Sequence, residues 1–102
     1  LWEIHIMHRS QHTVQATLCL LDDSKKLPLV FTEKNKVLFK VGNVSEKTHD
    51  IFILHQDQSN RFSFHCSEDI NSKCLCVKSK EVILDRPSQT TEHLFDMELH
   101  CV

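Results

Sequence analysis

Residues 2–20 read WEIHIMHRSQHTVQATLCL, and apolar side chains alternate with polar ones along both halves of this stretch. Trp2 and Ile4 alternate with charged or polar neighbours, and residues 14–20 repeat the pattern. Because successive side chains of a β-strand point to opposite faces, this period of two is typical of strands with one buried face. The polar residues 8–13 between the halves predict a connecting loop.

The same period continues along the rest of the chain. Further strands are predicted at 27–31, 37–41, 51–54, 62–65, 74–77, 82–84 and 94–99. No window shows an apolar stripe with the 3.6-residue period of a helix, and any helix is expected to be a single turn at 45–49. About nine short strands at roughly ten-residue spacing predict an all-β sandwich or barrel.

The turns of such a fold have only one glycine to use, Gly42. Positive backbone φ angles are otherwise tolerated best by Asn and Asp, and Ser also favours turns. Turns are therefore predicted at Asp22–Asp23, Asn35–Lys36, Ser59–Asn60 and Asp69–Asn71.

Length and charge narrow the class of protein. The 102 residues are the size of one domain, and 40% hydrophobic with 25% charged residues allow a packed core. Twelve Lys and Arg against 14 Asp and Glu give a net charge of -2, so the chain lacks the basic field that attracts nucleic acid. Its apolar runs are far shorter than the roughly 20 residues of a membrane helix, so no membrane insertion is expected.

Cysteine and histidine are frequent enough to require an interpretation. Five cysteines cannot all pair internally, so at least one thiol is expected to stay free. Cys74 and Cys76 could bind zinc together with the adjacent His65–Cys66, but this spacing differs from that of structural zinc sites and favours core thiols without a metal. The eight scattered histidines are interpreted as a surface property that makes the net charge sensitive to mildly acidic pH.

The sequence contains no catalytic motif. A phosphate-binding loop or a G-x-S-x-G motif needs more than one glycine. No nucleophile motif surrounds a cysteine, and the carboxylate pairs Asp22–Asp23 and Glu68–Asp69 lie in stretches typical of turns. The sequence therefore predicts a protein that is not an enzyme and needs no cofactor, and that binds another protein through exposed loops.

In their order and in their amino-acid sequences, the predicted strands resemble those of the interleukin-1 cytokine family, in particular its interleukin-18 and interleukin-33 branch. The motifs that carry this resemblance are LWEIHIMHRSQ (1–11), VQATLCL (14–20), NKVLFKV (35–41), HDIFILHQ (49–56), SNRFSFHC (59–66), KCLCV (73–77), EVIL (81–84) and EHLFDMEL (92–99). Phe64, Cys66 and Cys74–Leu75 stand at positions of the family signature, although the chain lacks the Pro or Gly often found between them.

The resemblance implies a β-trefoil, a fold of twelve strands in three pseudo-repeats that is about half as long again as this chain. The nine or so predicted strands would correspond to the fourth through the twelfth, so residues 1–102 are expected to form a single partial trefoil domain that lacks the first repeat. Barrel edges and core residues left exposed would make the isolated chain poorly stable or prone to self-association.

The resemblance also implies a function and a set of binding residues. Family members are non-enzymatic cytokines, made in the cytoplasm without a signal peptide and released to the extracellular space, which bind an immunoglobulin-domain receptor and then recruit an accessory receptor. Candidate contacts to the first receptor are Arg9, His12, Val14 and Gln56. Candidate contacts to the accessory receptor are Lys36, Lys40 and Asp50. Because the first repeat contributes receptor contacts in relatives, a decoy or inactive form is an alternative.

The sequence alone also allows a protein of a different class. An intracellular all-β interaction domain without cytokine activity could share the same alternation. The start of the sequence, LWEIHIMHRS, lacks the order of charged and apolar residues found in a signal peptide, and this fits a protein made in the reducing cytosol.

Overall fold

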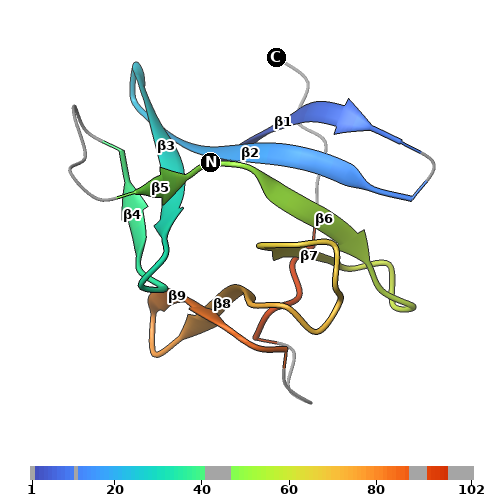
Figure 1. Ribbon diagram of the computed structural model, residues 1–102. Helices are drawn as coiled ribbons and strands as arrows, with labels where there is room; N and C mark the ends of the chain where they lie inside the picture. Colours follow the sequence, from blue (N-terminus) through green and yellow to red (C-terminus); the bar gives the residue numbers. More distant parts are fainter. Residues whose placement is uncertain (1, 11, 41–46, 88–91, 97–102) are drawn as a thin grey trace.

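The computed structural model describes residues 2–10, 12–40, 47–87 and 92–96. These residues form nine strands and no helix (Figure 1). In chain order the strands are β1 (Trp2–Arg9), β2 (Val14–Asp22), β3 (Lys25–Thr32), β4 (Val37–Phe39), β5 (Thr48–His49), β6 (Phe52–Gln56), β7 (Phe62–His65), β8 (Cys74–Lys78) and β9 (Glu81–Asp85). The all-β class predicted from the alternation is confirmed. Within the described ranges there is no helix long and apolar enough to cross a membrane.

The strands form one antiparallel sheet that runs in the order β4-β3-β2-β6-β7-β8-β9. β1 pairs with β2 and β5 pairs with β3 outside this path. In Figure 1 the strands surround a central space, with β2 above it, β3 and β4 on the left, and β8 and β9 below. The sheet is barrel-like and nearly closed, which is compatible with a trefoil-like fold.

The long strand β2 organises this sheet because it pairs with three others. Residues 14–16 pair with β6, residues 19–22 pair with β3, and the opposite edge pairs with β1. Ala16 and Leu18 of this strand are 0% and 5% exposed. The strand predicted at 14–20 is therefore the central element of the molecule.

Several segments differ from the predicted strands. Strand β1 runs to Arg9, into the loop predicted at 8–13. Residues 48–49 form β5, where a loop or a helical turn was expected, because His49 pairs with Phe31 and its ring contacts the phenyl ring at 5.4 Å. Strand β3 begins at Lys25 and includes Pro28, where its ladder with β2 ends because proline has no N–H to donate.

The strand predicted at 94–99 is reduced, in its described part, to a single bridge. The amides of Phe95 and Phe62 each donate to the other residue's carbonyl at 2.8 Å. Residues 97–99 of this prediction, residues 45–46 of the predicted helical turn and Val41 at the end of the strand predicted at 37–41 lie outside the described residues.

Asparagine and aspartate occupy the tight turns, as the scarcity of glycine predicts. Asp23, Asn35 and Asn60 have φ angles of 53°, 66° and 63°, which only a few residue types tolerate. The β8–β9 turn was not predicted. It places Ser79 and Lys80 at φ angles of 50° and 65°, as a two-residue hairpin turn of type I′ requires.

The core lies on the inner side of the barrel. Its buried cluster consists of Leu18, Leu29, Phe31, Phe52, Phe64, Leu75 and Leu84. These residues come from six different strands, so the cluster joins β2 and β3 to β8 and β9. Phe52 is completely buried and packs against Phe31 with ring centroids 5.0 Å apart.

Candidate functional site

The β1–β2 loop and the end of β6 bring together the four candidate contacts to the first receptor. Arg9 pairs with Val14 across the hairpin, and Val14 pairs on its other side with Leu54. The antiparallel direction of this ladder carries Gln56, two residues further along β6, towards His12. Arg9, His12 and Gln56 are exposed and Val14 is half-buried. We call Arg9, His12, Val14 and Gln56 the loop-end surface.

Short-range hydrogen bonds fix the backbone of this loop. The amide of Ser10 donates to the carbonyl of Thr13 at 2.9 Å, and the amide of Thr13 donates back to the Ser10 hydroxyl at 3.1 Å. The two hydroxyl oxygens are 2.8 Å apart. Serine and threonine favour such local bonds, which replace the missing glycine as a way to close the turn around His12. Gln11 lies outside the described residues.

The three candidates for the accessory contact lie around β3, and we call Lys36, Lys40 and Asp50 the second surface. Lys36 is held in the β3–β4 turn, where its amide donates to the Thr32 hydroxyl at 3.2 Å. Asp50 directly follows β5, which pairs with the same end of β3. The amide of Lys40, at the far end of β4, donates to the carbonyl of Pro28 at 2.8 Å. All three side chains are exposed.

The structure thus groups the seven candidates into two separate surfaces. β3 and β6 pair with different halves of β2, so the elements that carry the second surface are distinct from those that carry the loop-end surface. In Figure 1 the β1–β2 loop and the end of β6 are on the right, whereas β3, β4 and β5 are on the left. Lys36 and Lys40 themselves lie at opposite ends of β4, one directly before and the other directly after the strand.

The cysteines near β8 are buried thiols. Cys74 and Cys76 are 0% and 2% exposed, as predicted for core thiols. Burial and the neighbouring Cys76 raise the pKa of Cys74 to about 12, and burial raises the pKa of Cys66 and of Cys76 as well. A thiol attacks as the thiolate, so the raised pKa makes these groups weak nucleophiles at neutral pH. The described residues contain no group of three His, Cys, Asp or Glu side chains arranged to hold a metal ion.

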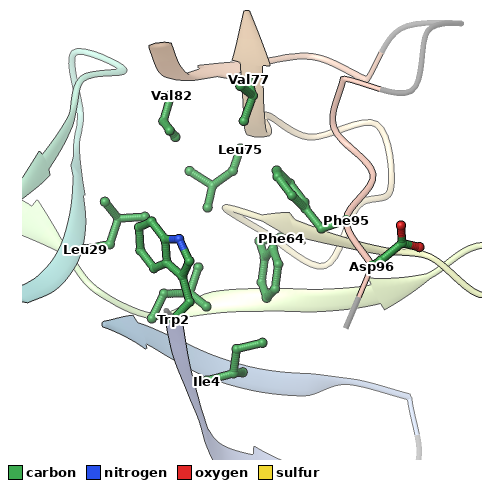
Figure 2. A pocket seen from close by; sticks show the side chains of 10 residues that line it. Trp2, Ile4, Leu29, Phe64, Leu75, Val77, Val82, Phe95 and Asp96 are labelled. Carbon is green, nitrogen blue, oxygen red and sulfur yellow. The ribbon is translucent and has the colours of Figure 1, made fainter. Parts of the chain in front are cut away.

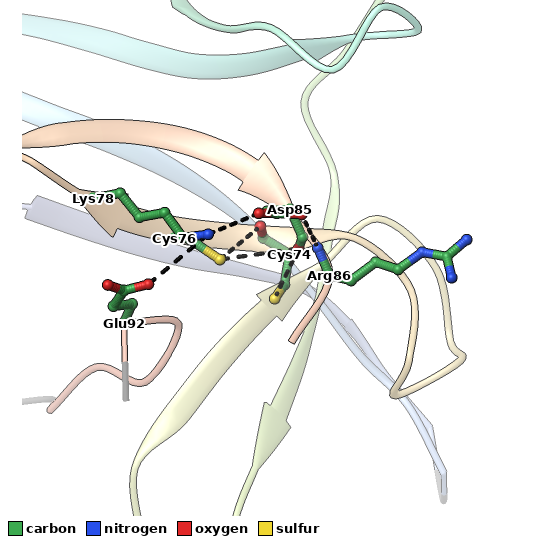
Figure 3. A network of polar contacts seen from close by, with 6 residues as sticks. All are labelled: Cys74, Cys76, Lys78, Asp85, Arg86 and Glu92. Carbon is green, nitrogen blue, oxygen red and sulfur yellow. Dashed lines mark hydrogen bonds and ion pairs between the residues drawn. The ribbon is translucent and has the colours of Figure 1, made fainter. Parts of the chain in front are cut away.

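A charged network covers the same hairpin at the surface (Figure 3). Lys78 binds Asp85 at 2.8 Å and lies 3.9 Å from Glu92. The ion pair holds the pKa of Lys78 above its ordinary value and, with the amide of Arg86, holds the pKa of Asp85 below its ordinary value. All these side chains are partly solvated, so their ion pairs contribute little to the stability of the fold. We interpret the network as a set of contacts that connect β8, β9 and the following loop.

Histidines form a cluster that the sequence interpretation missed. His65 is only 1% exposed, which corrects the view of the histidines as a surface property. Its ring contacts that of His55 edge to face, with centroids 4.6 Å apart. His65, His55 and His93 together line a small cavity of about 80 Å³. The alternation of Ser63 and His65 with two phenylalanines was the available signal, since it places both polar side chains on one face of β7.

The hydrogen bonds of His65 define its tautomer. Its Nδ1 lies 3.2 Å from the carbonyl of Ser72, which can only accept, so Nδ1 carries the proton. Nε2 then accepts a hydrogen bond from the Ser63 hydroxyl at 2.8 Å. Burial first, and then the neighbouring His55, hold the pKa of His65 below its ordinary value. Nε2 of His55 and Nδ1 of His93 are buried atoms without a hydrogen-bond partner among the described residues.

The barrel interior contains an apolar hollow of about 220 Å³ (Figure 2), which we call the barrel cavity. Its lining residues are Trp2, Ile4, Leu18, Leu29, Phe64, Leu75, Val77, Val82, Phe95 and Asp96. Trp2 is 44% exposed and stacks on Phe39, with ring centroids 6.0 Å apart. The sequence predicted exposed core residues in general but did not identify this cavity, because its walls come from strands far apart in the chain.

Comparison with known proteins identifies no relative. No model of a protein family, no curated protein and no solved structure matches the chain. The resemblance to the interleukin-1 family therefore rests on the strand motifs alone.

Proposed function

We propose that this chain is a cytokine-like domain of the interleukin-1 type, which acts by surface complementarity to an immunoglobulin-domain receptor. The observation that carries the proposal is the convergence of Arg9, His12, Val14 and Gln56 on one end of the sheet. These residues are separated by up to 47 positions in the sequence, from 9 to 56, and the ladders of β2 with β1 and β6 bring them together.

The chemistry of the loop-end surface supports this role. Protein interfaces combine a partly apolar centre with charged and polar groups at the rim, and Arg is enriched in them. Val14 offers a half-buried apolar centre here, and Arg9, His12 and Gln56 are exposed around it. Because the loop is held by the Ser10–Thr13 hydrogen bonds, little conformational entropy is lost when a partner binds.

The second surface is proposed to contact the accessory receptor. Its location around β3, away from the β1–β2 loop, would allow two partners to bind one small domain without contacting the same residues. In this proposal the loop-end surface binds the first receptor, and the second surface then recruits the accessory receptor. The chain is proposed to be made in the cytoplasm and released to the extracellular space, as in the family that it resembles.

The test is surface plasmon resonance against a panel of immunoglobulin-domain ectodomains of interleukin-1-family receptors. The double variant Arg9→Glu/Gln56→Ala is expected to weaken the first binding step at least tenfold, because it reverses a charge and removes a polar contact beside the apolar centre at Val14. The double variant Lys36→Glu/Asp50→Lys is expected to bind the first receptor normally and to fail in recruiting the second.

A matched control is the charge reversal Glu68→Lys, at an exposed residue outside both surfaces. It should leave both steps unchanged, and circular dichroism should show that all variants fold. Binding of the first receptor with unaltered affinity after the Arg9→Glu/Gln56→Ala change would contradict the proposed interface. If the wild-type chain binds the first receptor but does not recruit the accessory receptor, the chain is a decoy and not an active cytokine.

A further inference from the structure

The barrel cavity has walls that the fold holds in place. Leu18, Phe64 and Leu75 are at most 5% exposed, and each belongs to a strand that is hydrogen-bonded to its neighbours. Figure 2 places Trp2 and Leu29 on one side of the space and Phe64 and Phe95 on another. These buried, close-packed side chains form a fixed part of the cavity wall.

The chemistry of the lining selects an uncharged occupant. Nine of the ten described residues that line the cavity are apolar. The tenth, Asp96, has a side chain that is 79% exposed and is 3.5 Å from the guanidinium Nε of Arg61, so it lies at the rim and is already paired. A charged group inside the cavity would lose its hydration without gaining a partner, whereas an apolar group would lose nothing.

The size of the cavity selects a small occupant. An apolar cavity of about 150 Å³ lined by Leu, Ile and Phe stays dry and binds benzene. A hollow of about 220 Å³ is roughly half as large again. It therefore fits an alkyl-substituted benzene or a compact hydrocarbon group of about six to ten carbon atoms.

We propose that the barrel cavity is a binding site for a small, uncharged, apolar molecule. Binding covers Trp2, Val77 and Val82, which are 44%, 41% and 38% exposed in the free chain. This site is independent of the proposed receptor contacts, because no residue of the loop-end surface or of the second surface lines the cavity.

Trp2 makes the site directly measurable, because it is the only tryptophan of the chain and it lines the cavity. The probe is bromobenzene, whose heavy atom quenches tryptophan fluorescence at contact. Quenching is expected to saturate at millimolar or lower concentration and to be reversed by ethylbenzene, which has no heavy atom. Quenching that rises linearly and is not reversed by ethylbenzene would overturn the proposal.

Two matched controls make the test specific. The anion 4-bromobenzoate carries the same heavy atom and should bind at least about tenfold more weakly than bromobenzene, because its carboxylate has no partner in the cavity. Val82→Asp should weaken bromobenzene binding at least about tenfold, whereas Ile6→Asp, at an equally exposed strand position outside the cavity, should not.

Variants at residue 82 decide whether bromobenzene occupies the barrel cavity or binds elsewhere on the chain. Circular dichroism verifies that Val82→Asp keeps the strand spectrum of the wild type. If Val82→Asp does not fold, Val82→Phe replaces it in the binding experiment, because it fills the cavity with an apolar ring. Equal binding by wild type and by folded variants at residue 82 would overturn the proposal.

Discussion

At the residue scale, three histidine side chains around one small cavity make the stability of the protein dependent on pH. His65 is buried with both ring nitrogens hydrogen-bonded, and it faces His55 of β6, His93 of the C-terminal segment and, further away, Asp69 of the β7–β8 loop. A proton on Nε2 of His65 would reverse the hydrogen bond with Ser63, whose hydroxyl would then have to accept. It would also place a cation beside two other titratable rings in a poorly hydrated space.

We therefore expect the protein to lose stability on mild acidification. The folded-state pKa of His65 lies below its ordinary value of 6.5, so its contribution to stability is complete above pH 6.5 and is lost progressively as the pH falls below that value. The urea midpoint of unfolding should be lower at pH 5.0 than at pH 7.5. Asp57 and Asp85, whose pKa values are lowered from 3.8, contribute a further loss only at still lower pH.

The source of this dependence can be assigned by substitution. His65→Asn should flatten the dependence of the midpoint on pH, whereas His8→Asn, at an exposed histidine of β1, should leave it unchanged. If His65→Asn does not fold, an NMR titration of the His65 ring in the wild-type protein gives the same information. A midpoint that is constant or rises between pH 7.5 and 5.0, or a His65 pKa above 6.5, would contradict the assignment.

The elements show which parts of the fold a local pattern can predict. Strand β2 has Ala16 and Leu18 buried on one face, so the alternation of VQATLCL reflects the structure directly. The alternation of WEIHIM correctly predicted a strand, but β1 has no buried residue, and Trp2 and Ile6 are exposed. β5 was not predicted because two residues carry no period, and its pairing depends on Phe31 from a distant strand. His65 was predicted to be exposed for a related reason. The alternation places His65 on the same face of β7 as Ser63, but it does not show whether that face is buried or exposed.

The β8–β9 turn leads to a prediction about stability. Lys80 has a φ angle of 65° without the side-chain hydrogen bonding that makes Asn and Asp tolerant of this region. Lys80→Gly relieves that strain but adds backbone entropy to the unfolded chain, so we expect a net stabilisation of up to about 1 kcal/mol. The measurement is the free energy of unfolding in urea.

The control for this change lies in the β2–β3 turn. Ser24 also occupies a two-residue turn but does not have a positive φ angle. Ser24→Gly should therefore give no stabilisation, since only the entropic cost applies. Equal effects of the two glycine substitutions would show that the backbone conformation of Lys80 carries no strain.

At the scale of the whole molecule, the most unusual feature is the number of large apolar side chains exposed at the surface. Trp2, Phe39, Leu38, Val77 and Val82 are large apolar residues that are each more than a third exposed. Trp2 and Phe39 stack on each other, and Trp2, Val77 and Val82 line the barrel cavity, so part of this surface is continuous with the core. Surface of this kind promotes association between copies.

The isolated chain is expected to be poorly stable and to self-associate. Sedimentation velocity should show a rise in mean mass as the protein concentration increases, and thermal unfolding should begin well below ~60 °C. The variant Phe39→Ser should reduce the association, because it removes half of the exposed aromatic pair, whereas Ile70→Ser, at an exposed residue away from that pair, should not. A monomeric protein with a cooperative transition above ~60 °C would contradict this expectation.

The pairing of β2 with three strands also determines the order in which the molecule can fold. Ala16 pairs with Ile6, ten residues earlier in the chain, and with Phe52, 36 residues later. The β1–β2 hairpin can therefore form early, but the β2–β6 ladder has to wait until the whole segment from β3 to β5 has been synthesised and closed as a loop. Such long-range pairing slows folding, and during that interval one edge of β2 stays open to other chains.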